Sequence, residues 1–210
     1  MSGRVKQFFA IFVVTVLIGG CAAFAPRVDP SSFYILGTLP ELDLAADKTT
    51  AGVIANFSVG LGPIELPGYL DRQQIATRTS TNRLSYSETD RWAAPLAEGF
   101  SRVLGQNISH LLDPARVIQF PWQSSDVPDY QVKIEVLQFE GNSTQEAWLM
   151  AHWSVSDRNK KILVGQRSQL KRRAVSQTIE DSVKALSETV GDLSREIANS
   201  LRSFEQQRKS

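Results

Sequence analysis

The feature that most constrains the fold is a regular apolar pattern close to the end of the chain. Eight apolar residues recur there at intervals of three or four, which places them along one side of an α-helix: Ile179, Val183, Leu186, Val190, Leu193, Ile197, Leu201 and Phe204. The pattern predicts a helix of about 26 residues over 179–204 with one narrow apolar seam. Sustained heptads also occur in coiled coils, but the sequence contains a single such helix, so we expect it to lie across a sheet.

A second apolar stripe predicts another long helix nearer the middle of the chain. Ser87 or Thr89 would begin this helix, with acidic residues in its first turn where they complement unpaired backbone amides. Asp113-Pro114 would end it. The stripe consists of residues spaced by three and four positions: Trp92, Leu96, Phe100, Val103, Leu104, Ile108 and Leu111.

Short runs of alternating apolar and polar residues predict β-strands around these helices. Within 132–139 the alternation shifts after Val136, which predicts a β-bulge. The last run is mostly polar and suits an edge strand or an exposed face. The sequence therefore predicts an α+β fold, with an antiparallel or mixed sheet and two long helices packed on one face. The predicted strands are 33–36, 53–61, 74–79, 83–86, 117–120, 132–139, 147–155 and 161–175.

The first 20 residues have the composition of a secretory signal. Arg4 and Lys6 precede an apolar run over 8–20, and two glycines precede Cys21, the single cysteine. The run is too short to span a hydrocarbon core of roughly 30 Å. A cysteine directly after small residues resembles a bacterial lipoprotein signal, which implies cleavage before Cys21 and covalent lipid on its sulfur and its new amine. The alternative, an uncleaved segment that happens to contain a cysteine, is disfavoured by the flanking charge and glycines.

These features divide the chain into a signal peptide (1–20), a lipidated cysteine with a tether (21–32) and a single α+β domain (33–206). The tether contains two prolines and no apolar period. In lipoproteins of this type an aspartate after the cysteine tends to retain the protein at the inner membrane. Ala22 stands there instead, so the resemblance implies attachment to the outer membrane, facing the periplasm.

The composition argues against several classes of function. The signal peptide holds two of the 23 basic residues and none of the 22 acidic ones, so the mature chain is close to neutral and offers no general field for nucleic acid. If Cys21 carries lipid, no disulfide or thiolate metal site can form. His110 and His152 lack a second histidine at ligand spacing. We therefore expect no catalytic residue, no metal and no cofactor apart from the lipid on Cys21.

Four acidic residues offer one alternative to that expectation. They could be assembled into an acid–base pair, but the sequence gives no reason to bring them together, and no nucleophile elbow or glycine-rich phosphate loop accompanies them. The four are Asp126, Asp129, Glu135 and Glu140.

Two segments resemble a known family. The first, 62–78, contains Leu66-Pro67-Gly68-Tyr69-Leu70-Asp71-Arg72, and the second, 86–96, contains Arg91-Trp92 followed by Pro95-Leu96. Both are similar to the ABC-transport auxiliary lipoprotein family, and the resemblance covers essentially the whole mature chain. It implies an outer-membrane lipoprotein that works beside a mammalian-cell-entry (MCE) domain protein and an ABC-type permease. The expected role is docking during lipid transport between the two membranes, without catalysis.

The first segment supplies the candidate partner-binding residues. Pro63 and Pro67 would stiffen the chain after a strand and present a rigid loop. Asp71 and Arg72 would either cross an interface or pair locally. For the second segment we expect a structural role, with Trp92 at the helix start packing on the loop. The candidates for partner binding are Leu66, Pro67, Tyr69, Leu70, Asp71 and Arg72, and the structural set is Arg91, Trp92, Pro95 and Leu96.

Other interpretations of the sequence remain open. An assembly or scaffold lipoprotein of another outer-membrane machine would bind a β-barrel instead of an MCE protein. The 179–204 seam could join copies into a homo-oligomeric ring, and the domain could hold a lipid between its sheet and helices. The basic run Lys171-Arg172-Arg173 could face anionic headgroups, although a solvated strand end is the simpler interpretation.

Overall fold

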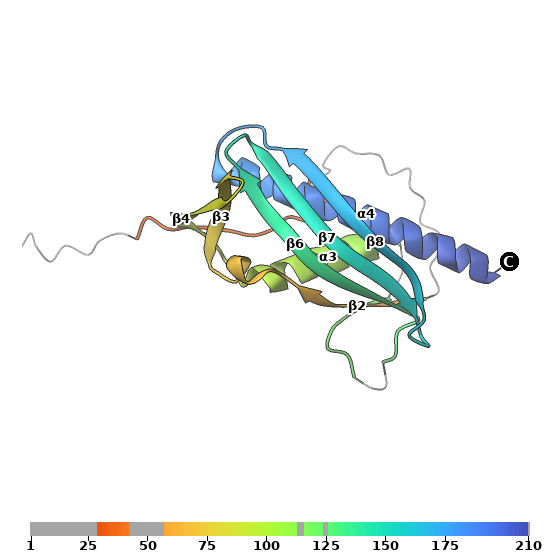
Figure 1. Cartoon of the computed structure of the whole chain (residues 1–210). Helices are drawn as coiled ribbons and strands as arrows, with labels where there is room; N and C mark the ends of the chain where they lie inside the picture. The colour runs from red at the N-terminus through yellow and green to blue at the C-terminus, as the bar shows by residue number, and fades with distance from the viewer. Residues whose placement is uncertain (1–28, 43–56, 113–115, 124–125, 210) are drawn as a thin grey trace, which may run out of the picture. The chain divides into compact units, whose positions relative to one another are not determined.

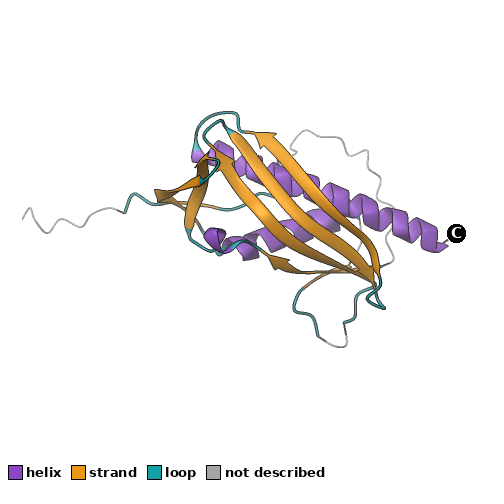
Figure 2. Cartoon of the chain, viewed as in Figure 1, coloured by secondary structure: helices purple, strands orange, loops and turns teal. Residues whose placement is uncertain are grey.

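The structure is a computed structural model that describes residues 29–42, 57–112, 116–123 and 126–209. Cys21 and the predicted signal peptide lie outside the described residues. All the elements belong to one compact unit, Ser31–Ser210, in which two long helices cross one face of a sheet (Figures 1 and 2). No helix within the described ranges combines the length and the apolar character needed to cross a membrane.

Helices and strands are interspersed along the chain. The helices are α2 (Leu39–Leu42), a 3₁₀ turn η2 (Gly68–Leu70), α3 (Leu96–Leu111) and α4 (Ile179–Lys209). The strands are β1 (Ser32–Tyr34), β2 (Ser58–Glu65), β3 (Gln74–Ser80), β4 (Arg83–Trp92), β5 (Arg116–Gln119), β6 (Tyr130–Asn142), β7 (Glu146–Asp157) and β8 (Ile162–Arg173).

The sheet is mixed, which confirms the predicted fold class. Its longest strand, β6, pairs along its length with β7 in antiparallel register, and β7 pairs with β8 in the same way. On its other edge β6 pairs in parallel with β2 and, at its far end, with β3. The order β1-β4-β3-β6-β2-β5 completes the sheet, with β7 and β8 beyond β6. Tight turns join β6, β7 and β8, which is why these three run antiparallel.

The predicted bulge in β6 is present. The register with β7 shifts between Val136 and Gln138. Because of the shift, Phe139 points toward the helices, whereas the original alternation would have placed Gln138 there. The Phe139 ring packs edge to face against the Phe100 ring of α3, with 5.3 Å between the ring centres. The bulge therefore keeps apolar side chains on the covered face along the whole strand.

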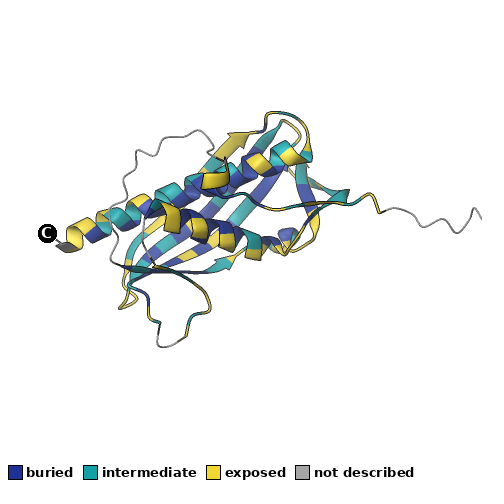
Figure 3. Ribbon diagram, turned by 180° about the vertical axis from the view of Figure 1, so that it is seen from behind, coloured by how far each residue is buried: buried dark blue, intermediate teal, exposed yellow. Residues whose placement is uncertain are grey.

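The long C-terminal helix lies across the sheet as predicted, and it extends five residues further, to Lys209. Thr178 begins it, since its Oγ1 accepts a hydrogen bond from the Asp181 amide. The seam from Val183 to Leu201 is buried against the strands (Figure 3). Because the seam is occupied inside its own domain, a homo-oligomer would have to use another surface.

The predicted start of the first long helix is wrong. Ser87–Trp92 belongs to strand β4, and α3 begins only at Leu96, after Pro95. Asp90, expected in a helical first turn, accepts hydrogen bonds from the hydroxyls of Tyr34 and Ser87. Pairing with β1 and β3 holds this segment extended, and Pro95 disfavours helix in the residue before it.

Strand β2 also departs from its predicted range. It continues through Pro63 to Glu65, and its pairing with β6 shifts between Leu61 and Ile64. Proline has no amide hydrogen to donate to the neighbouring strand, so the pairing becomes irregular at Pro63. The predicted strand residues 53–56 lie outside the described part of the chain.

Candidate partner-binding site

The loop after β2 is ordered by its own turn of 3₁₀ helix. The Leu70 amide donates to the Pro67 carbonyl at 2.9 Å, and the Asp71 amide to the Gly68 carbonyl at 3.2 Å. Leu70 is only 4% exposed, and Leu66 and Tyr69 pack against the core, while Asp71 is exposed. The turn therefore directs the large apolar side chains of the loop inward and leaves its charged end outside.

Tyr69 is fixed by a buried carboxylate. Its hydroxyl donates to Oε2 of Glu140 at 2.7 Å, and Arg78 Nε donates to Oε1 of the same carboxylate at 2.6 Å. Gln138 adds a third donor at 2.9 Å. Glu140 is 1% exposed, and a carboxylate this deeply buried needs such donors to remain in the fold. The network joins the loop, the β3–β4 hairpin and the central strand β6.

The environment also holds these partners in the protonation states that the network needs. Burial, reinforced by the hydrogen bond and charge of Glu140, raises the pKa of the Tyr69 phenol well above its usual value. Burial alone would lower the pKa of Arg78, but Glu140 outweighs it and raises that pKa. Tyr69 therefore stays a hydrogen-bond donor, and Arg78 stays charged.

Arg72 pairs locally. Its guanidinium lies over the ring of Tyr86, 4.6 Å from the ring centre, and the Tyr86 hydroxyl donates to the Tyr69 carbonyl at 3.2 Å. Asp71 has no side-chain partner among the described residues. Of the six candidate residues, Asp71 and Arg72 are exposed, Leu66, Pro67 and Tyr69 are partly buried, and Leu70 is buried. Partner binding itself stays a prediction.

The second motif separates into two elements. Trp92 ends strand β4 instead of beginning a helix, and its amide donates to the Gln73 carbonyl at 2.7 Å. Trp92 and Leu96 are 6% and 5% exposed, and both belong to the core. Pro95 precedes the first turn of α3. Arg91 is partly buried, and its Nε has no hydrogen-bond partner among the described residues.

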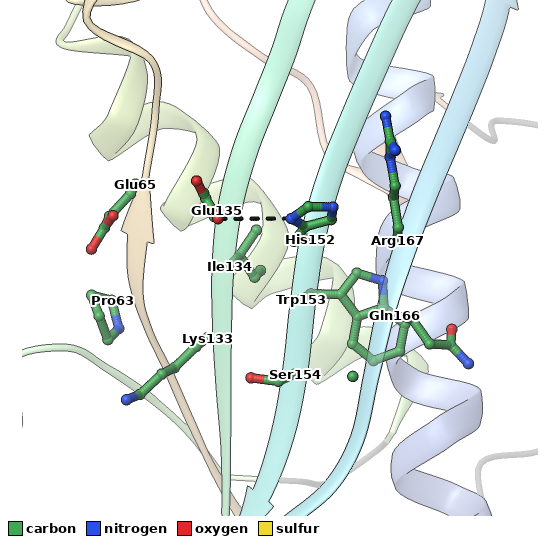
Figure 4. Close-up of a pocket in the computed structure, with 11 residues that line it drawn as sticks. Pro63, Glu65, Lys133, Ile134, Glu135, His152, Trp153, Ser154, Gln166 and Arg167 are labelled. Carbon is green, nitrogen blue, oxygen red and sulfur yellow. Dashed lines mark ion pairs between the residues drawn. The ribbon is translucent and has the colours of Figure 1, made fainter.

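The open face of the sheet carries a polar hollow of about 580 Å³, which was not predicted from the sequence. Figure 4 shows Lys133 and Glu135 of β6, His152 of β7 and Arg167 of β8 along it. His152 Nδ1 lies 3.8 Å from Glu135 Oε2, and both side chains are at least half exposed. The indication present in the sequence was that these residues occupy the polar positions of strands in which apolar and polar residues alternate.

The four acidic residues considered for acid–base chemistry have separate partners. Glu140 binds Tyr69 and Arg78, and Glu135 lies near His152. Asp126 pairs with Arg116, and Asp129 accepts hydrogen bonds from Ser58 and Arg158. Within the described ranges, no three His, Cys, Asp or Glu side chains are placed to hold a metal ion.

The basic run at the end of β8 is engaged locally as well. The Lys171 ammonium lies 3.6 Å from the centre of the Trp148 ring. Arg172 makes two hydrogen bonds to Asp192 of α4, at 2.7 and 2.6 Å. These contacts favour the simpler interpretation of the run as a strand end, tied to the helix behind it.

The structure defines the fold class: an α+β domain with a mixed sheet, two helices on one face and an ordered loop that contains the candidate residues. The chain belongs to the ABC-type transport auxiliary lipoprotein family, whose model matches residues 38–198. This match confirms the resemblance. Membership indicates a lipoprotein, anchored to a membrane on the periplasmic side, that serves ABC-type transport as an auxiliary component.

Two solved structures show the same fold at low sequence identity. One is a Xanthomonas campestris protein of a family of unknown function, with a TM-score of 0.67, 14% identity, and coverage of 85% of this chain and 100% of that one. The other is an uncharacterised protein with a TM-score of 0.67, 18% identity, and coverage of 81% and 98%. No curated protein is significantly similar in sequence.

Proposed function

We propose that this protein is an outer-membrane-anchored periplasmic lipoprotein that docks onto an MCE-domain protein and its ABC-type permease during lipid transport between the membranes. The observation that carries the proposal is the family match over 38–198, together with the Leu66–Arg72 and Arg91–Leu96 motifs on which the resemblance rests. The role is binding, without catalysis and without a cofactor other than the lipid on Cys21.

The exposed end of the 66–72 loop is the proposed contact with the MCE partner. Asp71 and Arg72 project from a turn whose other side is fixed by the Tyr69–Glu140–Arg78 network. A rigid loop loses little conformational freedom on binding, so its contacts contribute more fully to affinity. Charged groups at such a position also steer association.

The test is a mild-detergent capture of the tagged protein from cells, with identification of bound proteins. Asp71→Ala with Arg72→Ala should reduce recovery of the MCE protein severalfold. Lys161→Ala is the matched control, because it is exposed at the opposite end of β6 and β7 and should change nothing. Tyr69 and Leu70 are unsuitable targets, since their loss would disturb the fold as well.

The outcomes separate the proposal from its alternative. Recovery of a β-barrel protein without an MCE protein would favour the assembly or scaffold role. Sedimentation of the lipidated protein with inner membranes would contradict the outer-membrane location. Normal MCE recovery by the Asp71/Arg72 variant would remove the loop from the interface while leaving the docking role in place.

A further inference from the structure

Strand β1 and the residue directly after it display two large apolar side chains to solvent. Phe33 is 63% exposed and Ile35 is 65% exposed. They alternate with Tyr34, whose hydroxyl binds Asp90 at 3.1 Å, and with Leu36, which is 2% exposed. The outward direction of Phe33 and Ile35 is therefore fixed by the inward packing of their neighbours.

A basic side chain shares this outward face. β1 pairs with β4 in parallel, and Phe33 is in register with Arg91, so the two side chains project to the same side of the sheet. Arg91 makes no side-chain hydrogen bond or ion pair among the described residues, and its Nε is buried without a partner. Asp90, the nearest acidic neighbour in sequence, is occupied by the hydroxyls of Tyr34 and Ser87.

The length of the preceding chain restricts what can cover this face. Phe33 lies twelve positions after Cys21, and a chain of that length spans at most roughly 40 Å even when fully extended. If Cys21 carries lipid in a bilayer, the β1 edge is therefore held close to that bilayer. The combination of exposed apolar residues with an unpaired arginine is what the interface between headgroups and acyl chains accommodates.

We propose that Phe33, Ile35 and Arg91 form a membrane-contact patch, which rests on the same bilayer that holds the lipid of Cys21. Phe33 and Ile35 enter the headgroup boundary, and Arg91 binds the phosphate of anionic lipid. The contact fixes the orientation of the domain relative to the membrane. This inference rests on the lipid anchor of the proposed function, and it goes beyond it by assigning a second attachment.

The test uses the lipidated full-length protein with single cysteine substitutions, because a lipidated Cys21 has no free thiol. A nitroxide label is attached to Phe33→Cys, Ile35→Cys, Ile162→Cys or Val175→Cys, in vesicles of phosphatidylethanolamine with a minor share of phosphatidylglycerol. Ile162, at the start of β8, and Val175, after the end of β8, are the matched controls, since they are 68% and 85% exposed and neither belongs to the β1–β4 pair. Labels at 33 and 35 should be severalfold less accessible to a water-soluble nickel complex than the controls, and more accessible to oxygen dissolved in the bilayer.

A second arm tests the arginine. With the label at 35, Arg91→Gln should raise the accessibility to nickel toward the value for the controls, and only in vesicles that contain phosphatidylglycerol. Arg83→Gln changes an exposed arginine on the same strand and should have no effect. Equal effects of the two substitutions would overturn the role assigned to Arg91.

The proposal is overturned if labels at 33 and 35 are as accessible to nickel as the controls. It is also overturned if they become shielded only when a partner protein or a higher concentration of the chain itself is added. Failure of the proposed function would be visible separately. A free Cys21 thiol in the unsubstituted protein would contradict the anchor, and loss of MCE capture would contradict docking.

Discussion

The two faces of the central strands differ although they alternate along the same residues. On the face that the helices cover, Val132, Ile134 and Val136 of β6 are at most 3% exposed. On the open face, Lys133 and Glu135 of the same strand are exposed. The covered face thus provides the hydrophobic stabilisation, while the open face can change its chemistry with little effect on the fold.

The open face is not uniform. At its upper end in Figure 1, near the β6–β7 turn, Glu140 is buried because Tyr69 and Arg78 close over it. Glu140 thus lies on the polar side of strand β6 but is buried in the interior. The comparison of the two faces therefore predicts large effects on the covered face, intermediate effects at Glu140 and small effects at the exposed positions.

The largest effect is expected on the covered face. Phe100→Ala removes a side chain with no exposed surface and its edge contact with Phe139. It should lower the free energy of unfolding by about 3–5 kcal/mol, measured by urea denaturation. His110→Ala, an exposed change on the same helix, should stay within about 0.5 kcal/mol. Similar losses for the two would contradict the assignment of α3's buried side.

An intermediate effect is expected at the buried carboxylate. Arg78→Met removes a charged donor from Glu140 and should lower the free energy of unfolding by about 1.5–3 kcal/mol. Adding Glu140→Gln should recover part of the loss, because a neutral amide needs no buried counter-charge. Additive losses in this double-mutant cycle would show that the pair is not coupled.

A smaller, pH-dependent effect is expected at Asp129, at the opposite end of β6. Burial disfavours its charged form, but hydrogen bonds from Ser58 and the charges of Arg158 and Arg208 outweigh burial and lower the pKa of Asp129. A carboxyl with a lowered folded pKa contributes stability above its unfolded pKa, near 3.9, and loses it as pH falls through the folded pKa. Asp129→Asn should cost about 1 kcal/mol at pH 7.

The measurement for Asp129 is urea denaturation of both proteins between pH 7 and pH 3. The difference between wild type and Asp129→Asn should shrink as the pH falls below about 4. A difference that is independent of pH would contradict the lowered pKa.

The smallest effect is expected in the hollow of the open face. Glu135→Gln changes a contact with His152 that spans 3.8 Å between two side chains, each at least half exposed. The free energy of unfolding should change by no more than about 0.5 kcal/mol. A loss above 1.5 kcal/mol would mean that this face contributes to the fold as the covered face does.

The periodic parts of the fold were predictable from the sequence. The spacing of Val183, Leu186 and Val190 identified α4 and its buried side, and the shift after Val136 identified the bulge in β6. These features repeat within a few residues, so a short window contains them. The helix and the bulge form because each allows apolar side chains on one side of the element to be buried.

Tertiary structure decided the start of α3 and the surroundings of the 66–72 loop. Ser87 and the acidic residues after it are good local signals for a helix start, but β1 and β3, distant in sequence, hold them in a strand. Tyr69 and Glu140 are 71 positions apart. No local pattern indicates that such residues will meet, because their contact depends on which strands are neighbours in the sheet. The sequence by itself determined that α4 and the long strand β6 form and which side of each is buried. Long-range pairing alone decided where α3 begins and which polar residues are buried. The reason is that backbone amides and carboxylates form hydrogen bonds with the groups that the assembled sheet places next to them.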